Sequence, residues 1–249
     1  MSVATGIPEA PAPAPRTAVV LLSGGLDSAT CLALARRWGW AVHALSFDYG
    51  QRHRVELGLA RRLARRWGAL SHRVARMPFL AEIGGSALTD RRLAVPRNAL
   101  GSKPIPSTYV PARNTIFLSA AAALAEVTGA TEVVIGANAL DYSGYPDCRP
   151  AYLRAFEKVA RLGTKAGDEG RALTIRAPLL RMSKARIVAL ALALGVDPAA
   201  TSSCYAPGAS GEPCGRCDAC LLRAKGFAEA GARDARLRRP TTKRARGRA

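Results

Sequence analysis

The run Ser-Gly-Gly-Leu-Asp-Ser, from Ser23 to Ser28, combines residue types that can hold a phosphate group. Two adjacent glycines let the backbone approach a phosphate closely, and the serine hydroxyls can donate hydrogen bonds to it. A carboxylate such as Asp27 is expected beside phosphates mainly when it binds a Mg²⁺ ion that bridges them. The alternative is a simple turn with a helix cap, where the same residue types are common. The chain lacks the G-x-x-x-x-G-K-[ST] order, which argues against a kinase or a GTPase.

Four cysteines within seventeen residues form the second group with chemical potential. They are Cys204, Cys214, Cys217 and Cys220. In a reducing compartment their C-x9-C-x2-C-x2-C pattern indicates a metal site before disulfides. Four thiolates suit one closed, tetrahedral Zn²⁺ site with Zn–S distances near ~2.3 Å, and an iron–sulfur cluster is the alternative. Cys31 and Cys148 stand alone, and we interpret both as small buried hydrophobic residues.

Alternating strand and helix patterns would position these two groups. Residues 17–22 form an apolar, β-branched run that ends at the glycine pair, and residues 28–38 follow with helical spacing. Further strands are predicted at 41–47, 70–74, 132–136 and 172–177. Further helices are predicted at 55–67, 114–128, 147–162, 183–194 and 219–230. This alternation predicts an α/β fold with a parallel sheet covered on both faces, in which ligands bind at the carboxyl ends of the strands.

Composition and charge limit the class of protein. With 249 residues, 49% of them apolar, the chain can bury a sizeable core. It has no run of eighteen apolar residues and no signal-peptide pattern, so we expect a soluble, cytoplasmic protein. The net charge of +19 favours polyanionic partners such as nucleic acid or nucleotide phosphates, although a general bias toward alanine and arginine would produce the same value. Residues 78–111 are rich in glycine, proline and serine, which predicts a functional loop or lid.

Six segments of the chain resemble those of a known family. Ser23 to Ser28 is similar to the SGGxDS signature of PP-loop ATP pyrophosphatases, which grip the β and γ phosphates of ATP and leave the α phosphate open to attack. The other five resemble segments of the 7-cyano-7-deazaguanine synthase family. They are residues 46–53, 109–114, 136–138 continuing into 141–150, 203–205 and 214–220. Together the segments cover about residues 17–230; Ser202 stands where the family usually has tryptophan.

This resemblance implies a carbon–nitrogen ligase of queuosine precursor biosynthesis. Such an enzyme would convert 7-carboxy-7-deazaguanine and ammonia to 7-cyano-7-deazaguanine through adenylated intermediates, with ATP, Mg²⁺ and one Zn²⁺ per chain as cofactors. Residues 17–197 would form a Rossmann-like PP-loop ATP pyrophosphatase domain and residues 198–232 a zinc-binding region with four cysteine ligands. We expect the leader 1–16 and the basic tail 233–249 to be disordered. A homodimer is implied, whereas no membrane or nucleic-acid partner is required.

The resemblance also implies which residues form the site. ATP binding is expected from Leu22, Ser23, Gly24, Gly25, Leu26, Asp27, Ser28, Ala29, Thr30, Cys31 and Leu32. Arg113 and Lys184 are the cations expected beside the phosphates, although each could be an ordinary surface residue. Contacts to the flat deazaguanine ring are expected from Asp48, Tyr49, Gln51, Asp141, Tyr142, Tyr145 and Asp147. Among the histidines, His43 and His72 are interpreted as structural, and only His53 is kept as a site candidate.

Two other functions remain compatible with the sequence. One is a PP-loop enzyme that thiolates or ligates tRNA directly, with the basic tail gripping the RNA backbone. Salt-dependent tRNA binding that disappears without residues 233–249 would identify that enzyme. The other is a nucleotide-binding or zinc-stabilised nucleic-acid module without catalysis. The presence of Ser23, Asp27 and Ser28 together argues against this module, and ATP-dependent release of AMP would exclude it.

Overall fold

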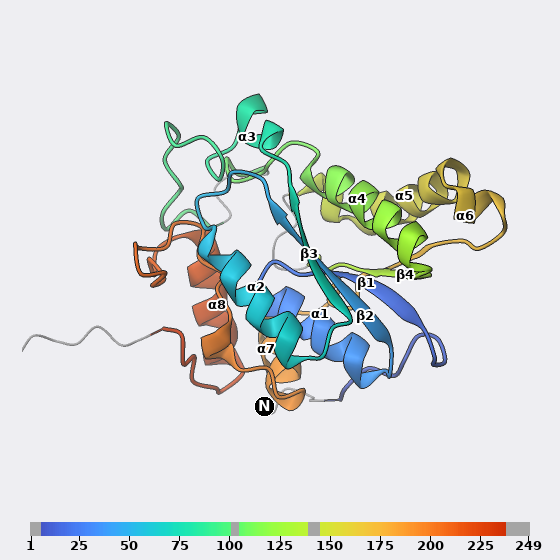
Figure 1. Ribbon diagram of the computed structural model, residues 1–249. Helices are drawn as coiled ribbons and strands as arrows, with labels where there is room; N and C mark the ends of the chain where they lie inside the picture. Colours follow the sequence, from blue (N-terminus) through green and yellow to red (C-terminus); the bar gives the residue numbers. More distant parts are fainter. Residues whose placement is uncertain (1–5, 101–104, 139–144, 238–249) are drawn as a thin grey trace, which may run out of the picture.

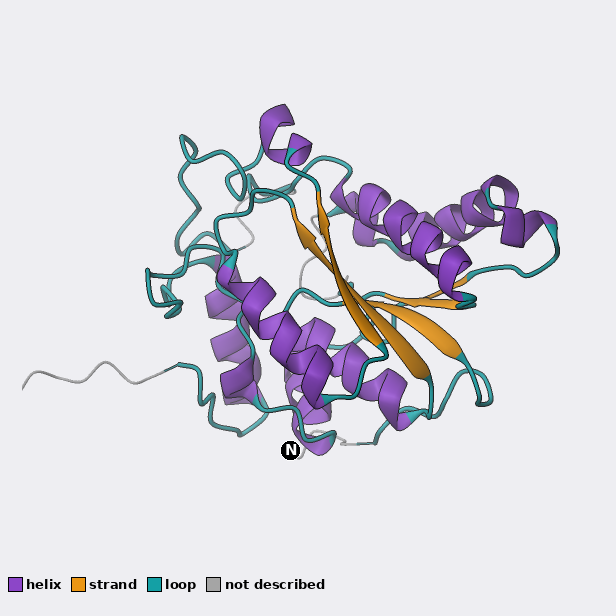
Figure 2. Ribbon diagram, viewed as in Figure 1, coloured by secondary structure: helices purple, strands orange, loops and turns teal. Residues whose placement is uncertain are grey.

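The computed structural model describes residues 6–100, 105–138 and 145–237 (Figures 1 and 2). A five-stranded parallel sheet in the order β3-β2-β1-β4-β5 forms its centre. The strands are β1 Thr17–Leu21, β2 Ala41–Asp48, β3 Ser71–Arg76, β4 Glu132–Val134 and β5 Thr174–Arg176. Because β1 lies in the middle, the chain first builds the sheet outward on one side and then returns to build it on the other.

Helices cover both faces of this sheet (Figure 1). One face packs against α1 Leu26–Arg37, α2 Val55–Arg66, α7 Lys184–Ala193 and α8 Asp218–Glu229. The other face packs against α4 Arg113–Thr128 and α5 Pro150–Gly163. Shorter elements are α3 Phe79–Ile83, α6 Lys165–Asp168 and the 3-10 turns Pro146–Cys148 and Pro198–Ala200. The molecule is therefore a three-layered α/β fold, as the sequence predicts.

The central strand β1 explains why the layers form. Its side chains alternate between the two faces, so that Ala18 and Val20 belong to the core under α1, whereas Val19 and Leu21 belong to the core under α4. All four are at most 8% exposed. A strand buried on both faces has to be apolar at every position, which is the continuous pattern seen in this segment.

The predicted strands and helices all form, with ends that differ by a few residues. The helix predicted from residue 147 is the main exception, because a 3-10 turn occupies residues 146–148 and α5 begins at Pro150, a residue suited to the first position of a helix. Within the long segment 78–111, the sequence patterns also missed α3. A helix of five residues is too short to show a periodic apolar stripe.

The segments expected to be disordered are only partly within the described residues. Residues 6–16 contain no helix or strand, but the carbonyl oxygen of Pro8 accepts a hydrogen bond from Trp38 Nε1 at 2.9 Å, and Ala12 packs against the core under α1. Residues 1–5 and 238–249 lie outside the described part of the chain. Disorder in these segments, and the division into domains, stay predictions. In the described ranges, no helix has both the length and the apolar character needed to cross a membrane.

Candidate active site

A cavity of about 300 Å³ opens at the carboxyl ends of three neighbouring strands. Its wall includes residues 21–23 and 25–28 at the end of β1, Tyr49 and His53 after β2, and residues 135–138 after β4. In open parallel sheets, ligands bind where the order of strands reverses, and here that point lies between β1 and β4. The glycine-rich run therefore lies at the position in the sheet where a nucleotide is expected.

The serines of the glycine-rich run hold it in a compact turn. The Ser23 N–H donates to Ser28 Oγ at 3.2 Å, and the two hydroxyl oxygens lie 3.0 Å apart. The Gly25 N–H in turn donates to Ser23 Oγ at 3.2 Å. These groups stand at the N-terminus of α1, where the helix dipole and free N–H groups favour an anion.

Both glycines of the run are confined by neighbouring backbone. Gly24 has a positive φ of 89°, and a side chain there would collide with the carbonyl oxygen of Glu56 in α2. A side chain at Gly25 would reach the carbonyl oxygen of Ser202 at 3.3 Å, and the Ser202 N–H donates to the Gly24 carbonyl at 3.0 Å. The turn is thus wedged between α2 and the segment that leads to the cysteines, so packing as well as phosphate access requires glycine here.

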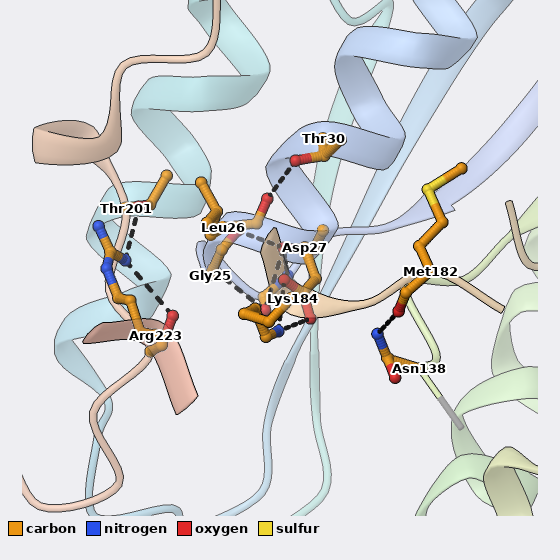
Figure 3. Close-up of polar contacts among 12 residues, drawn as sticks. Gly25, Leu26, Asp27, Thr30, Asn138, Met182, Lys184, Thr201 and Arg223 are labelled. Carbon is orange, nitrogen blue, oxygen red and sulfur yellow. Dashed lines mark hydrogen bonds and ion pairs between the residues drawn. The ribbon is translucent and has the colours of Figure 1, made fainter. Parts of the chain in front are cut away.

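Asp27 and Lys184 point toward one another at the mouth of this turn (Figure 3). The Lys184 ammonium lies 3.0 Å from Asp27 Oδ1 and 2.7 Å from Oδ2. Their side chains are 26% and 17% exposed for Asp27 and Lys184, respectively. Lys184 is the first residue of α7, so the first turns of α1 and α7 bring a carboxylate and an ammonium to one side of the cavity. Lys184 thus lines the cavity and is mostly buried, and its role at the phosphates stays a prediction.

The remaining residues predicted to bind ATP are buried beneath the turn. They are Leu22, Leu26, Ala29, Thr30, Cys31 and Leu32, each at most 1% exposed. Leu22 and Leu26 line the cavity, whereas the Thr30 hydroxyl donates to the Leu26 carbonyl at 2.8 Å. Burial, and next the nearby Asp27, raises the pKa of Cys31, so this thiol is an inert core residue. These side chains fix the turn from below.

Arg113 brings a buried guanidinium to the opposite side of the cavity. Its central carbon is 5.9 Å from the ring centre of Phe117 and 5.9 Å from that of Tyr145. Its Nε is buried and has no hydrogen-bond partner among the described residues. The preceding Ala112 adopts a positive φ of 54°, a strained conformation that aims the start of α4 at the cavity. An unpaired donor of a fixed cation, flanked by aromatic faces, suits an anionic group on a flat ring.

A carboxyl group lies in the same corner as Arg113. Glu56 is 8% exposed; its Oε1 accepts a hydrogen bond from Gln51 Nε2 at 3.2 Å and lies 3.5 Å from His53 Nε2. Burial raises the pKa of Glu56 to about 8, against the effects of Gln51 and Arg113. Burial lowers the pKa of His53 to about 4, helped by Arg113. At neutral pH this corner therefore holds a mostly protonated carboxyl beside a neutral imidazole.

The predicted substrate residues divide into two groups. Tyr49 and Tyr145 line the cavity. Asp48, Gln51 and Asp147 are absent from the cavity wall and bond within the scaffold. Asp48 pairs with Arg54, and Gln51 hydrogen-bonds to the backbone of residues 47 and 49. Asp147 accepts from the Asn114 N–H at 3.0 Å. Asp141 and Tyr142 lie outside the described residues. Substrate contacts by any of these residues stay predictions.

Several residues of the cavity wall were not predicted as site residues. They are Glu56, Asn114, Phe117, Asn138 and Ser202, all of which face the cavity. Asn138 Nδ2 donates to the Met182 carbonyl at 2.8 Å and so joins the end of β4 to the segment before α7 (Figure 3). A signal for Glu56 was present, since it shares one face of the predicted helix with Leu59, Ala60 and Leu63. A carboxylate on an apolar helix face is rarely without a function or a partner.

The four clustered cysteines form a second site behind the cavity. Their sulfur atoms all lie within 4.8 Å of one another, and those of Cys204 and Cys217 are 4.0 Å apart. One tetrahedral ion with Zn–S bonds near ~2.3 Å would separate its sulfurs by roughly 3.8 Å. Backbone N–H groups of Cys214 and Cys217 donate to the sulfurs of Cys204 and Cys214, at 3.2 and 3.3 Å. Hydrogen bonds from Cys204 and Cys220 lower the pKa of Cys217. The cluster could therefore hold a metal ion.

A buried ion pair attaches this cluster to the rest of the fold. Arg223 of α8 donates to both carboxylate oxygens of Asp234, at 2.6 and 2.9 Å, and both side chains are 4% exposed. Arg223 also donates at 2.9 Å to Oγ1 of Thr201, which shortly precedes the first of these cysteines (Figure 3). Such a fully bonded pair fixes the position of Ser202, and through Ser202 that of the glycine turn.

Comparison with known proteins agrees with this geometry. A family model described as "Queuosine biosynthesis protein QueC" matches residues 17–231. The chain belongs to this 7-cyano-7-deazaguanine synthase family. A relative of that name from Anaeromyxobacter sp. (strain Fw109-5) is 60% identical over 225 residues, which cover 89% of this chain and 96% of the relative. Another, from Thiobacillus denitrificans (strain ATCC 25259 / T1), is 59% identical over 217 residues, covering 87% and 96%.

The family accounts for the enzyme class predicted from the sequence. Its members are ligase-type enzymes of queuosine biosynthesis, and the resemblance seen in the sequence motifs is confirmed. Among solved structures, that of NMN synthetase from Francisella tularensis is similar with a TM-score of 0.47 and 19% identity, covering 89% of this chain and 79% of that one. That similarity is too distant to indicate a shared function.

Proposed function

We propose that this chain makes 7-cyano-7-deazaguanine from 7-carboxy-7-deazaguanine and ammonia, with two ATP molecules cleaved to AMP and pyrophosphate. The family name supplies the product; the acid, the nitrogen source and the adenylated intermediates are what the proposal adds. One observation carries it. A single cavity joins the glycine turn, which suits a triphosphate, to a buried arginine among aromatic rings, which suits a flat anionic heterocycle.

The reaction divides between the two sides of the cavity. A carboxylate oxygen of the substrate attacks the α phosphorus of ATP, and pyrophosphate leaves with the bonding electron pair. Ammonia then attacks the acyl carbon and AMP departs, which leaves an amide. The amide oxygen is adenylated in the same way, and loss of AMP and protons produces the nitrile. The backbone N–H groups of the turn and the cations Lys184 and Arg113 would offset the negative charge that develops on the departing groups.

Mg²⁺ is expected to enter with the nucleotide. When bound it would neutralise charge on the phosphates, and Asp27 is the carboxylate on the phosphate side that would hold it. Lys184 pairs with Asp27, so the carboxylate already points to the mouth of the turn.

Zn²⁺ is the metal we propose for the cysteine cluster. Sulfurs within 4.8 Å of one another fit a single tetrahedral ion better than a four-iron cluster, in which each cysteine binds a different iron and the sulfurs lie further apart. A site with four protein ligands is closed to substrate, so its role is to stabilise the segment that supports the glycine turn. A homodimer and a cytoplasmic location also belong to this proposal.

The decisive test supplies the purified protein with ATP, Mg²⁺, ammonium and 7-carboxy-7-deazaguanine. We expect 7-cyano-7-deazaguanine by mass spectrometry, together with AMP and pyrophosphate. Formation of ADP, or absence of the nitrile, would contradict the proposal. ATP-dependent modification of added tRNA without any nitrile would instead support the tRNA-modifying alternative.

A further inference from the structure

Glu56 is a cavity residue to which the proposed reaction gives no role. Its carboxyl is buried, lines the cavity and is influenced by the Arg113 charge, whereas Asp27 pairs with Lys184. A buried carboxyl is costly unless hydrogen bonds or charges compensate it. The presence of a buried carboxyl on the apolar face of α2 therefore indicates that this part of the cavity binds a polar ligand.

The hydrogen bonds of Gln51 determine which of its groups donates to the Glu56 carboxyl. Gln51 Oε1 accepts from the Tyr49 N–H at 2.8 Å, and Gln51 Nε2 donates to the Phe47 carbonyl at 2.8 Å. The amide therefore cannot flip, and it presents an N–H group to Glu56 Oε1. This hydrogen bond orients the carboxyl toward the cavity and favours its ionised form. The cation that faces Glu56 is Arg113, and Tyr49 and His53 are the other titratable groups around it.

The proposed reaction needs a proton acceptor in this cavity. Ammonium is the abundant species at neutral pH, but only neutral ammonia has the electron pair that attacks an acyl carbon. Asp27 is engaged with Lys184 on the phosphate side, and His53, with a pKa of about 4, is a weak base. Burial raises the pKa of Glu56 to about 8, so its ionised form is a stronger base than His53. A cation that enters beside Glu56 stabilises this ionised form and so opposes the effect of burial on the pKa.

We propose that the Glu56 carboxyl, which lines the cavity beside His53, forms the ammonium-binding site, and that Glu56 is the catalytic base that converts ammonium to ammonia; this inference rests on the proposed function. The Glu56 carboxylate takes one proton from ammonium. The nitrogen electron pair then forms the C–N bond, the C–O bond to AMP breaks, and its electrons leave with the AMP phosphate. A second nitrogen proton passes to solvent as the amide forms, and Glu56 releases its proton before the next turnover. Arg113 disfavours a second cation nearby and so promotes deprotonation.

The test separates activation of the acid from use of the nitrogen. Exchange of labelled pyrophosphate into ATP, dependent on 7-carboxy-7-deazaguanine, reports adenylation without any amine. In Glu56→Gln this exchange is expected to stay within about threefold of the unaltered protein, whereas kcat/KM for ammonium falls by about 10²-fold or more. Hydroxylamine, which is already neutral at pH 7, needs no base, and we expect Glu56→Gln to form the hydroxamate at close to the normal rate. Glu229→Gln, at an exposed glutamate of α8, is the matched control.

The outcomes distinguish Glu56 as a catalytic base from Glu56 as a residue that only positions other groups. Normal use of ammonium by Glu56→Gln would overturn the inference, and so would an equal loss with hydroxylamine, because Glu56 would then only position other groups. If Glu56→Gln does not fold, the pH profile of the unaltered protein decides. A rate with total ammonium that levels off near pH 8 supports Glu56, whereas a rate that keeps rising with free ammonia contradicts it. Absence of the pyrophosphate exchange in the unaltered protein would overturn the proposed function and, with it, this inference.

Discussion

Asp27 and Glu56 are two carboxyl groups that line one cavity, in opposite electrostatic surroundings. Asp27 lies at the mouth of the glycine turn, partly exposed, with its charge matched by Lys184 at 2.7 Å. Glu56, on the inner face of α2, is almost fully buried, and an amide donor and the Arg113 cation only partly compensate burial. A carboxylate beside an ammonium group at the mouth of the turn is suited to binding a cation, whereas a desolvated carboxyl holds a proton and can exchange it. The same side-chain chemistry is thereby suited to two tasks.

The cysteine cluster supports both carboxyl groups, so its loss has the largest expected effect. Cys217→Ser removes one of the four proposed metal ligands and should weaken the segment that donates from Ser202 to Gly24. We expect Tm to fall by more than about 5 °C, since 1 kcal/mol corresponds to about 2–4 °C at this size. Thermal unfolding with and without a chelator is the measurement. Chelation should lower Tm in the unaltered protein and leave Cys217→Ser unchanged; an equal response of both would refute a metal at this site.

The two carboxyl groups should differ most sharply in pyrophosphate exchange. Asp27→Asn removes a charge from the phosphate side, and we expect a loss of about 10²–10³-fold in the exchange rate, the size seen when a group that stabilises the transition state is removed. Glu56→Gln changes the other carboxyl of the cavity, which is mostly protonated at neutral pH, and should leave exchange nearly intact. Comparable losses in the two variants would show that Asp27 and Glu56 do not have separate roles in adenylation and in the use of ammonium.

Gly24 is the point at which the two regions touch. Gly24→Ala would place a methyl group against the Glu56 carbonyl oxygen and force alanine to a φ of 89°. The backbone conformation alone costs about 1–3 kcal/mol, so we expect a lower Tm together with slower exchange and weaker ammonium use. Gly129→Ala, at a positive φ with open space around it, carries the backbone cost without the collision and is the control. Loss of exchange in that control as well would mean that general destabilisation, and not the contact with α2, is responsible.

The smallest expected effect is on the pH dependence of stability. The folded state holds the Glu56 proton up to about pH 8, whereas the unfolded chain releases it near the usual carboxyl pKa of 4.5. Between these values the folded state binds more protons, so this group makes the protein less stable as pH rises. Replacement by glutamine abolishes that term, so the stability of Glu56→Gln relative to the unaltered protein should rise with pH between about pH 6 and pH 8. A Tm difference that does not change with pH would show that Glu56 is not buried as a proton-holding group.

Much of this architecture could be predicted because it depends on local patterns. The apolar run at residues 17–22, the glycine pair after it and the helical spacing of residues 28–38 are sufficient to define a strand, a turn and a helix. Four cysteines at short spacing likewise require few assumptions about the fold. The predicted substrate residues were less informative, since Gln51 and Asp147 hydrogen-bond within the scaffold. A polar residue near a strand end can brace the backbone as readily as bind a ligand, and sequence alone does not separate these roles.

The sequence by itself determined the α/β class, the order of the elements, the position of the glycine-rich turn and the family. Only the tertiary structure decided that Lys184 meets Asp27 across 157 positions, and that Glu56 faces the same cavity from α2. The reason is physical. Periodicity records which side of an element is buried, but the environment of a titratable group depends on every element packed around it. Burial, Arg113 and Gln51 together set the pKa of Glu56, and the three influences come from segments that meet only when the chain folds.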